Sequence, residues 1–341
     1  MNCSIDLNAD LGEQPEEKAR DIALMQVISS CNIACGGHAG DEASMAVMLR
    51  AARAAGVAAG AHPSYPDRPG FGRVSLDMPL DALIGSLLEQ VRALESVAAR
   101  EGVALTHIKP HGMLYNDLAD RPGMALAVAE ALHSAFPHLA QVGLAHSASE
   151  EAARAVSARF IAEGFVDRGY TPARRLVPRS QPGALIASDT DRAAQAIAIA
   201  TGEPIAANDG SLIHVMAQSL CIHSDSPGAE QTALRIAGEM AVLGITIKAP
   251  GELPDEPVDL LRRCLVDDPG LAHRTRGGPR SGGGRRWLGR YRAGARQPVA
   301  ELEPGGAQPG GRARCGRDAC RKRFRGSAYG IDRPCHIAHM L

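Results

Sequence analysis

The chain has 341 residues, of which 45% are hydrophobic and only 3% aromatic, so a large core has to be built from Ala, Leu, Val and Ile. No apolar run is long enough to cross a membrane, and the first residues lack the basic and apolar regions of a secretory signal. We therefore expect a soluble cytoplasmic protein with no membrane partner.

The net charge of −1 conceals two regions of opposite sign. Residues 1–250 carry 19 basic and 28 acidic side chains, whereas residues 251–341 carry 18 basic and 10 acidic ones. A change of sign on this scale is typical of segments with different roles. It indicates one domain over residues 1–250 and a separate tail over residues 251–341.

Strand-like and helix-like patterns alternate along the first 250 residues. Short apolar runs predict strands near residues 2–8, 27–34, 57–61, 105–109, 141–145, 160–165 and 219–223. Amphipathic patterns predict helices over residues 41–55, 80–100, 123–135, 148–158, 189–200 and 228–243. Such alternation is typical of a parallel sheet, and about seven strand–helix units favour a closed (β/α) barrel over an open doubly wound sheet.

The tail is dense in Gly, Arg and Pro and contains few large apolar residues. This composition favours disorder, because burial cannot offset the entropy lost on ordering. Nucleic-acid binding by an arginine-rich segment is one alternative, and a zinc module is another, although Cys315, Cys320, Cys335, His336 and His339 match no zinc spacing. We favour a third alternative, a frameshifted end of GC-rich coding sequence, and expect no nucleic-acid partner.

Polar side chains stand where the first predicted strands end. Asp6, Asn8 and Asp10 alternate along a strand, so their side chains face the same side. His38 and His62 each follow a strand end made of small residues, where glycines leave room for a ligand. Asp10, His38 and His62 suit either a metal site of unknown metal or an acid–base set, and their spacing does not separate the two.

A further cluster follows the fourth predicted strand. Lys109 and His111 flank Pro110, whose rigid ring fixes their relative positions. Lys109 is suited to hold a carboxylate or phosphate, or to stabilise an oxyanion. Because the carboxyl ends of parallel strands meet on one face, we expect Lys109 and His111 to share one catalytic pocket with Asp10, His38 and His62.

Several other polar residues are candidates for binding the substrate. Arg68 lies in a Pro- and Gly-rich segment over residues 62–73, which is too long and rigid for a simple connection. The later strand ends and the first strand supply the remaining candidates, which are Asn8, Asp167, Arg168, His223 and Asp225. A surface ion pair is the plainer interpretation of Asp167 and Arg168.

Together these motifs resemble the LamB/YcsF family. Seven stretches carry the resemblance, in order: IDLNADLGE (5–13), SCNIACGGHAGD (30–41), GAHPSYPDRPGFGR (60–73), HIKPHGMLYND (107–117), EGFVDRGYTP (163–172), RLVPRSQPGAL (175–185) and CIHSDSPGA (221–229). Two features depart from the family pattern. Ser224 stands where the family usually has Gly, and the tail from about residue 251 has no counterpart.

The resemblance implies a barrel related to the glycoside hydrolase/deacetylase group. It also implies the A component of 5-oxoprolinase, which opens 5-oxo-L-proline to L-glutamate with ATP in a complex with B and C subunits. That chemistry requires a cation for the substrate carboxylate, a base for water and donors for the oxyanion. The candidates are Lys109 or Arg168 for the cation, Asp10 or His38 for the base, and His62 or His111 for the donors.

The sequence contains no Walker loop or dinucleotide fingerprint, so we expect the ATP site to be shared with or carried by partner subunits. Two other functions remain open. The first is a metal-dependent amidase or carbohydrate deacetylase that acts without ATP. The second is a non-catalytic protein of the complex that binds a small acid.

Overall fold

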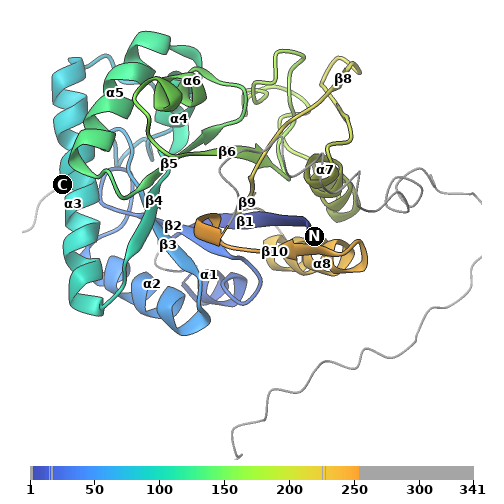
Figure 1. Ribbon diagram of the computed structural model, residues 1–341, viewed down its shortest axis with the longest axis horizontal. Helices are drawn as coiled ribbons and strands as arrows, with labels where there is room; N and C mark the ends of the chain where they lie inside the picture. Colours follow the sequence, from blue (N-terminus) through green and yellow to red (C-terminus); the bar gives the residue numbers. More distant parts are fainter. Residues whose placement is uncertain (1–2, 15, 17, 225, 227, 253–341) are drawn as a thin grey trace, which may run out of the picture. The chain divides into compact units, whose positions relative to one another are not determined.

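The computed structural model describes residues 3–14, 16, 18–224, 226 and 228–252 (Figure 1). Residues 253–341 of the expected tail lie outside these ranges, and so does the candidate site residue Asp225. The expectations of disorder, of a zinc module and of a frameshift in the tail therefore stay predictions.

Seven parallel strands form a closed barrel. They are β1 (Cys3–Leu11), β2 (Ser30–Ala34), β3 (Ala58–His62), β4 (Leu105–Ile108), β5 (Ala140–Leu144), β6 (Phe160–Phe165) and β9 (Ser219–His223). Neighbouring strands pair in that order, and β9 pairs with β1 to close the ring. The expected α/β fold, a barrel of about seven strands, is therefore confirmed.

Helices connect the strands and lie outside the barrel (Figure 1). They are α1 (Lys18–Leu24), α2 (Glu42–Ala55), α3 (Leu80–Glu101), α4 (Gly112–Asp120), α5 (Pro122–Ala135), α6 (Ala148–Ala155), α7 (Asp189–Thr201) and α8 (Ala229–Val242). Local signals set several of their ends. Asp41 caps α2 by accepting a hydrogen bond from the Ser44 N–H at 2.8 Å, and Gly56 ends the same helix with a left-handed backbone at φ 70°.

The structure contains elements that the patterns did not predict. Helices α1 and α4 are short, and α4 begins at Gly112, within a Lys-Pro-His-Gly run that is typical of a loop. Strands β7 (Ile205–Ala206) and β8 (Leu212–Ile213) form a small antiparallel hairpin outside the barrel. Elements of two residues carry too few side chains for a periodicity to be visible.

Strand β1 is paired along one edge by two later strands. Its first half pairs with β10 (Ile245–Ile247), and its second half pairs with β9. Strand β10 is followed by a 3-10 turn at Pro250–Glu252, whose Pro250 carbonyl accepts a hydrogen bond from Arg159 Nη2 at 2.6 Å. Residues close to position 250 are therefore part of the folded barrel.

Small residues in the strands make room for polar side chains inside the barrel. Gly60 of β3 faces the His107 ring of β4, and a Cβ atom at Gly60 would lie 2.3 Å from that ring. A larger residue at position 60 would displace His107, whose Nε2 shares a hydrogen bond with Asn32 Oδ1 at 2.8 Å. The low aromatic content thus matches an interior in which aliphatic and polar side chains take the available volume.

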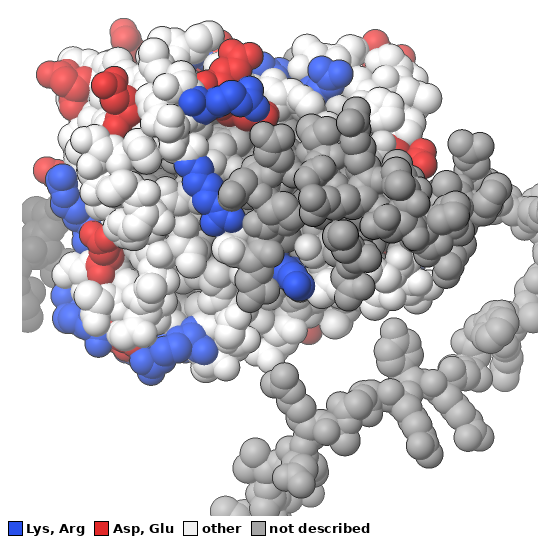
Figure 2. All heavy atoms as spheres, in the orientation of Figure 1, with Lys and Arg blue, Asp and Glu red and all other residues white. Residues whose placement is uncertain are grey.

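Two surface properties bear on the expected environment. No helix in the described part of the chain is both long enough and apolar enough to traverse a bilayer. Figure 2 shows basic and acidic side chains interspersed over the described part of one face, where neither sign forms a broad patch.

We predict that a chain ending at Glu252 keeps the fold. The barrel closes through β9 and β10, both of which end before that position, and the tail composition is poor in residues that can be buried. The melting temperature of the shortened chain should lie within about 2 °C of the full-length value, as measured by calorimetry. A drop of about 8 °C or more would show that the tail contributes to the barrel.

Candidate active site

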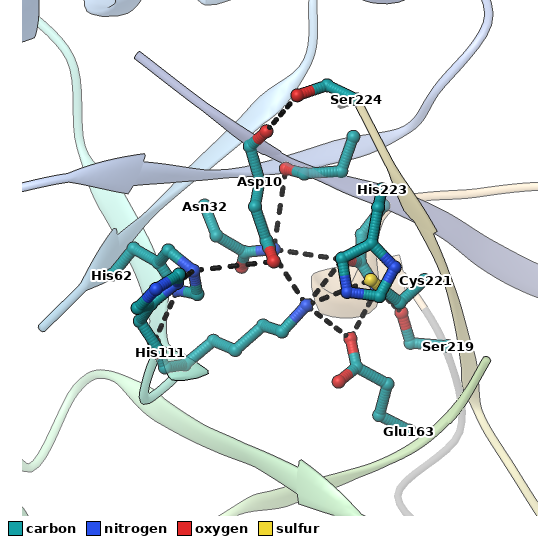
Figure 3. A network of polar contacts seen from close by, with 12 residues as sticks. Asp10, Asn32, His62, His111, Glu163, Ser219, Cys221, His223 and Ser224 are labelled. Carbon is teal, nitrogen blue, oxygen red and sulfur yellow. Dashed lines mark hydrogen bonds and ion pairs between the residues drawn. The ribbon is translucent and has the colours of Figure 1, made fainter. Parts of the chain in front are cut away.

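The five expected catalytic side chains come together at the carboxyl ends of the strands. Asp10 lies near the end of β1, His62 ends β3, and Lys109 and His111 follow β4. Figure 3 shows Asp10, His62 and His111 close together. His38 joins them from the loop after β2, where its ring stacks on that of His111 with centroids 3.6 Å apart. All five are buried, so their charges and hydrogen bonds have to be satisfied within the protein.

Lys109 is held by groups from three other strands. Its Nζ lies 2.9 Å from Asp10 Oδ1, 3.0 Å from Glu163 Oε1 and 3.1 Å from Cys221 Sγ. Although burial alone lowers the pKa of Lys109, Asp10, Cys221 and Glu163 together raise it well above its usual value. Lys109 is therefore a fixed cation.

Asn8 and Asn32 connect the Lys109 ammonium to the buried His107 ring through hydrogen bonds. Asn8 Nδ2 donates to Glu163 Oε1 at 2.8 Å, and Asn8 Oδ1 accepts from Asn32 Nδ2 at 2.9 Å. Asn32 Nδ2 also donates to Asp10 Oδ1 at 2.8 Å, and its Oδ1 faces His107 Nε2. Burial lowers the pKa of His107 to about 3, so this ring is neutral. Asn8 thus helps to hold Glu163 and Asn32 in position.

Main-chain carbonyl groups determine which nitrogens of His62 and His111 carry protons. His62 Nδ1 donates to the Lys109 carbonyl at 2.7 Å, and His111 Nε2 donates to the Phe71 carbonyl at 3.0 Å. Phe71 has a left-handed backbone with φ 54°, a conformation that costs energy for a non-glycine residue. The opposite ring nitrogens, His62 Nε2 and His111 Nδ1, lie 3.0 Å apart.

Glu13 faces these two nitrogens from the turn after β1. Its Oε1 lies 3.1 Å from His111 Nδ1, 3.8 Å from His62 Nε2 and 3.0 Å from His38 Nε2. Burial tends to raise the pKa of Glu13, but its contacts with His111 and His38 hold it below its usual range. Glu13 is therefore an anion that contacts all three imidazoles.

A second imidazole–carboxylate pair lies across the pocket. His223 Nδ1 donates to both oxygens of Asp167, at 2.9 and 3.0 Å, and Ser226 Oγ donates to Asp167 Oδ2 at 2.9 Å. Burial tends to raise the pKa of Asp167, but His223 and Ser226 lower it to about 2. The carboxylate thus holds the His223 ring so that Nε2 is available as a base.

A cavity of about 490 Å³ is lined by Asp10, Glu13, His62, Lys109, His111 and His223, and it is large enough for a small metabolite. Its wall includes the buried Arg168 guanidinium, which donates to the Ala184 and Val177 carbonyl groups at 3.1 and 2.7 Å. Among the described residues no carboxylate lies within salt-bridge distance of Arg168. Arg179 also lines the cavity, and burial together with Arg179 lowers the pKa of Arg168.

The structure does not bring every expected residue into the cavity. Arg68 Nη1 instead donates to the Gly36 and Gly40 carbonyl groups at 3.0 and 2.8 Å, where it ties two loops together. His38 does not line the cavity and reaches it only through Glu13. Arg68 therefore holds two loops together, and His38 contacts the cavity wall only through its hydrogen bond to Glu13.

Sequence reasoning missed Glu13 and Glu163. Glu13 follows Gly12, whose φ of 73° turns the chain after β1, and it belongs to the stretch IDLNADLGE. Glu163 is completely buried in an otherwise apolar strand. An isolated carboxylate in such a strand requires a buried partner, and this signal could have marked Glu163 as part of a buried polar site.

The match to a known family covers nearly the whole described barrel. Residues 5–254 match the model of the LamB/YcsF family. The chain belongs to this family. A relative from Agrobacterium fabrum, described as the first A-type component of 5-oxoprolinase, is 41% identical over 248 residues, which are 72% of this chain and 97% of the relative. The resemblance inferred from the sequence motifs is therefore confirmed.

One solved structure agrees with this assignment. The lactam utilization protein from Thermus thermophilus is 34% identical, with a TM-score of 0.67 over 72% of this chain and 99% of that one. A family 4 carbohydrate esterase from Streptomyces lividans is 13% identical, with a TM-score of 0.40 over 72% of this chain and 92% of that one.

We predict that Lys109→Met destabilises the protein by about 3–5 kcal/mol, because it leaves Asp10 and Glu163 buried without their cation. Urea unfolding followed by circular dichroism measures this change. Lys18→Met, at an exposed position, serves as the control and should cost less than about 0.5 kcal/mol. A Lys109→Met protein as stable as the wild type would contradict the proposed role of this ion pair.

We also predict a pH-dependent contribution from Asp167. Its folded pKa of about 2 lies below the ordinary value of 3.8, so its ionised form stabilises the fold above about pH 4, and this stability is lost as the pH falls towards 2. The difference in unfolding free energy between wild type and Asp167→Asn should shrink by about 2 kcal/mol between pH 6 and pH 2. Asp77→Asn, an exposed control, should show little change; a constant difference for Asp167→Asn would refute the assignment.

Proposed function

We propose that this chain is the A component of a 5-oxoprolinase, which opens 5-oxo-L-proline to L-glutamate. The observation that carries the proposal is a buried arginine with no carboxylate partner among the described residues, in one cavity with an oriented imidazole. The 41% identity to such a component over nearly its full length supports it. A lactam that carries a carboxylate has two groups that such a cavity can hold, the carboxylate beside the arginine and the ring amide beside the imidazole.

Arg168 and Arg179 are the groups that bind the substrate carboxylate in this proposal. A buried guanidinium without a counterion is costly, and an anionic ligand removes that cost. Lys109 was the other candidate, but its ammonium already contacts Asp10, Glu163, Asn8 and Cys221. Lys109 is therefore assigned to positioning Asp10, and Arg168 to the substrate.

His223 is the base that we assign to the attacking water, in place of Asp10 or His38. Its Nε2 takes a proton from water as the oxygen bonds to the lactam carbonyl carbon. When the carbon–nitrogen bond breaks, the same proton passes to the departing ring nitrogen and yields the free amine of glutamate. Asp167 remains ionised throughout and stabilises the imidazolium.

ATP enters the proposal because a lactam is a stabilised amide that water attacks slowly. Transfer of the γ-phosphoryl group to the lactam oxygen creates a carbon that water attacks readily. Departure of the ring nitrogen then leaves an acyl phosphate, and a second water hydrolyses it to the carboxylate of glutamate and free phosphate. The sequence has no phosphate-binding Walker loop, so we propose that the ATP site lies wholly or partly on B and C subunits. A cytoplasmic location stays a prediction.

One observation favours the alternative of a metal-dependent amidase that acts without ATP. Glu13, His38, His62 and His111 place four potential ligand atoms within 4.8 Å of one another. Lactam or acetamide hydrolysis by the isolated chain, with added divalent metal and no nucleotide, would support this alternative over the ATP-dependent reaction.

We predict that the purified chain alone releases no glutamate from 5-oxo-L-proline, whereas addition of the B and C subunits yields glutamate and ADP together. Coupled assays for both products, with and without each partner, measure this. ATP-coupled turnover by the chain alone would contradict the placement of the nucleotide site on the partners.

Within that complex, Arg168→Met should raise KM for 5-oxo-L-proline about 10- to 100-fold, because it removes the cation that binds the carboxylate. His223→Asn should instead lower kcat by about 100- to 10,000-fold with little change in KM. Arg154→Met, on an exposed helical surface, is the control and should change neither value. Equal effects of Arg168→Met and His223→Asn on KM would count against these separate roles.

A further inference from the structure

Three ligand atoms in the cavity present lone pairs towards one another. They are His62 Nε2, His111 Nδ1 and Glu13 Oε1 (Figure 3 shows the two rings). The carbonyl groups of Lys109 and Phe71 keep the protons of both rings on the opposite nitrogens. Two imidazole lone pairs and an anion at close range repel one another unless a cation lies between them.

The separations of these atoms match a metal-binding triangle. They are 3.0 Å between the nitrogens, 3.1 Å from Glu13 Oε1 to His111 Nδ1 and 3.8 Å from Glu13 Oε1 to His62 Nε2. Ligands about 2.0–2.1 Å from a tetrahedral zinc ion are about 3.3 Å apart, and the observed triangle has a point about 2 Å from all three atoms.

His38 fits a supporting position better than a ligand position. Its Nε2 must donate to Glu13 Oε1, because a carboxylate only accepts, while its Nδ1 is buried without a hydrogen-bond partner among the described residues. If Nε2 bound a metal, the ring proton would move to Nδ1, where the described part of the chain offers no acceptor. His38 therefore orients Glu13, as partners of metal ligands commonly do.

A second group of possible ligands lies nearby but is less suited to a cation. It comprises Asp10, Cys221 and His223. The Lys109 ammonium lies 2.9 Å from Asp10 Oδ1 and 3.1 Å from Cys221 Sγ, so a positive charge already occupies this side. Figure 3 shows Asp10 between the His62 and His111 rings and the other two members, Cys221 and His223, and its Oδ2 lies 3.4 Å from His62 Nε2.

We infer that His62, His111 and Glu13 form a binding site for one divalent transition metal ion of the zinc class. Two imidazoles and one carboxylate are typical ligands of such ions, and the cavity leaves the remaining coordination position open. When bound there, such an ion supplies Lewis acidity towards a carbonyl oxygen or a water molecule. The inference differs from the set of Asp10, His38 and His62 that the sequence suggested, and it does not depend on the proposed function.

The test is metal binding by the full-length chain. Protein stripped with a chelator is titrated with Zn²⁺ by calorimetry and with Co²⁺ by visible absorption, and its bound metal is counted by mass spectrometry. We expect about one ion per chain, a Co²⁺ spectrum of a four-coordinate nitrogen and oxygen site, and a raised melting temperature with Zn²⁺.

Variants locate the site. His62→Gln, His111→Gln and Glu13→Gln should each weaken binding more than about 100-fold, and His38→Gln, which keeps the three ligands, should weaken it about 10- to 100-fold. His138→Gln removes an exposed histidine and should leave the affinity unchanged. Circular dichroism confirms that each variant is folded.

Three results would overturn the inference. The first is wild-type protein that binds no Zn²⁺ or Co²⁺, which would show that a shared proton joins the two rings instead. The second is affinity that survives all three ligand variants. The third is a charge-transfer band of cobalt bound to sulfur, which would locate the metal on cysteines such as those at positions 315, 320 and 335.

Discussion

The buried Lys109 ammonium is the interaction on which the interior of this barrel depends. Two carboxylates, an asparagine and a thiol contact it from β1, β6 and β9, so one cation joins strands that are far apart in the sequence. A barrel that places acids on its inner face must supply such a cation, since ionised groups buried alone are too costly. The same contacts keep one oxygen of Asp10 turned away from the histidines and leave the other facing His62.

From this centre the polar groups separate into two halves with different electrostatic character. On one side, the Glu13 carboxylate gathers three imidazoles around it. On the other, Arg168 and Arg179 lie beside an imidazole held by Asp167, and Arg168 has no carboxylate partner in the described part of the chain. The cavity therefore offers a negative and a positive subsite, an arrangement that orients a small zwitterionic or polarised molecule in one direction.

The barrel and much of the site could be predicted from the sequence, because both rest on local patterns. Apolar runs followed by His62 or Lys109 mark strand ends, and parallel strand ends must converge. The need of Glu163 for a buried partner could be predicted, but its pairing with Lys109 could not, because the barrel register decides which buried acid meets which base. Arg68 was misleading for a related reason: its loop folds back, so the guanidinium reaches two carbonyl groups of a neighbouring loop.

The pairing of β1 with β9 and β10 has a consequence for how the chain folds as it is made. Contacts such as Cys3 with Ile245 and Asp6 with Ser219 join residues more than 200 positions apart. Until β9 and β10 are synthesised, one edge of β1 lacks hydrogen-bond partners. The acidic side chains on the inner face of β1 are then not yet enclosed by the closed barrel. Closure of the barrel is thus a late step that joins residues far apart in the sequence. Before it, the nascent chain exposes the edge of an open sheet, which has to be protected from aggregation.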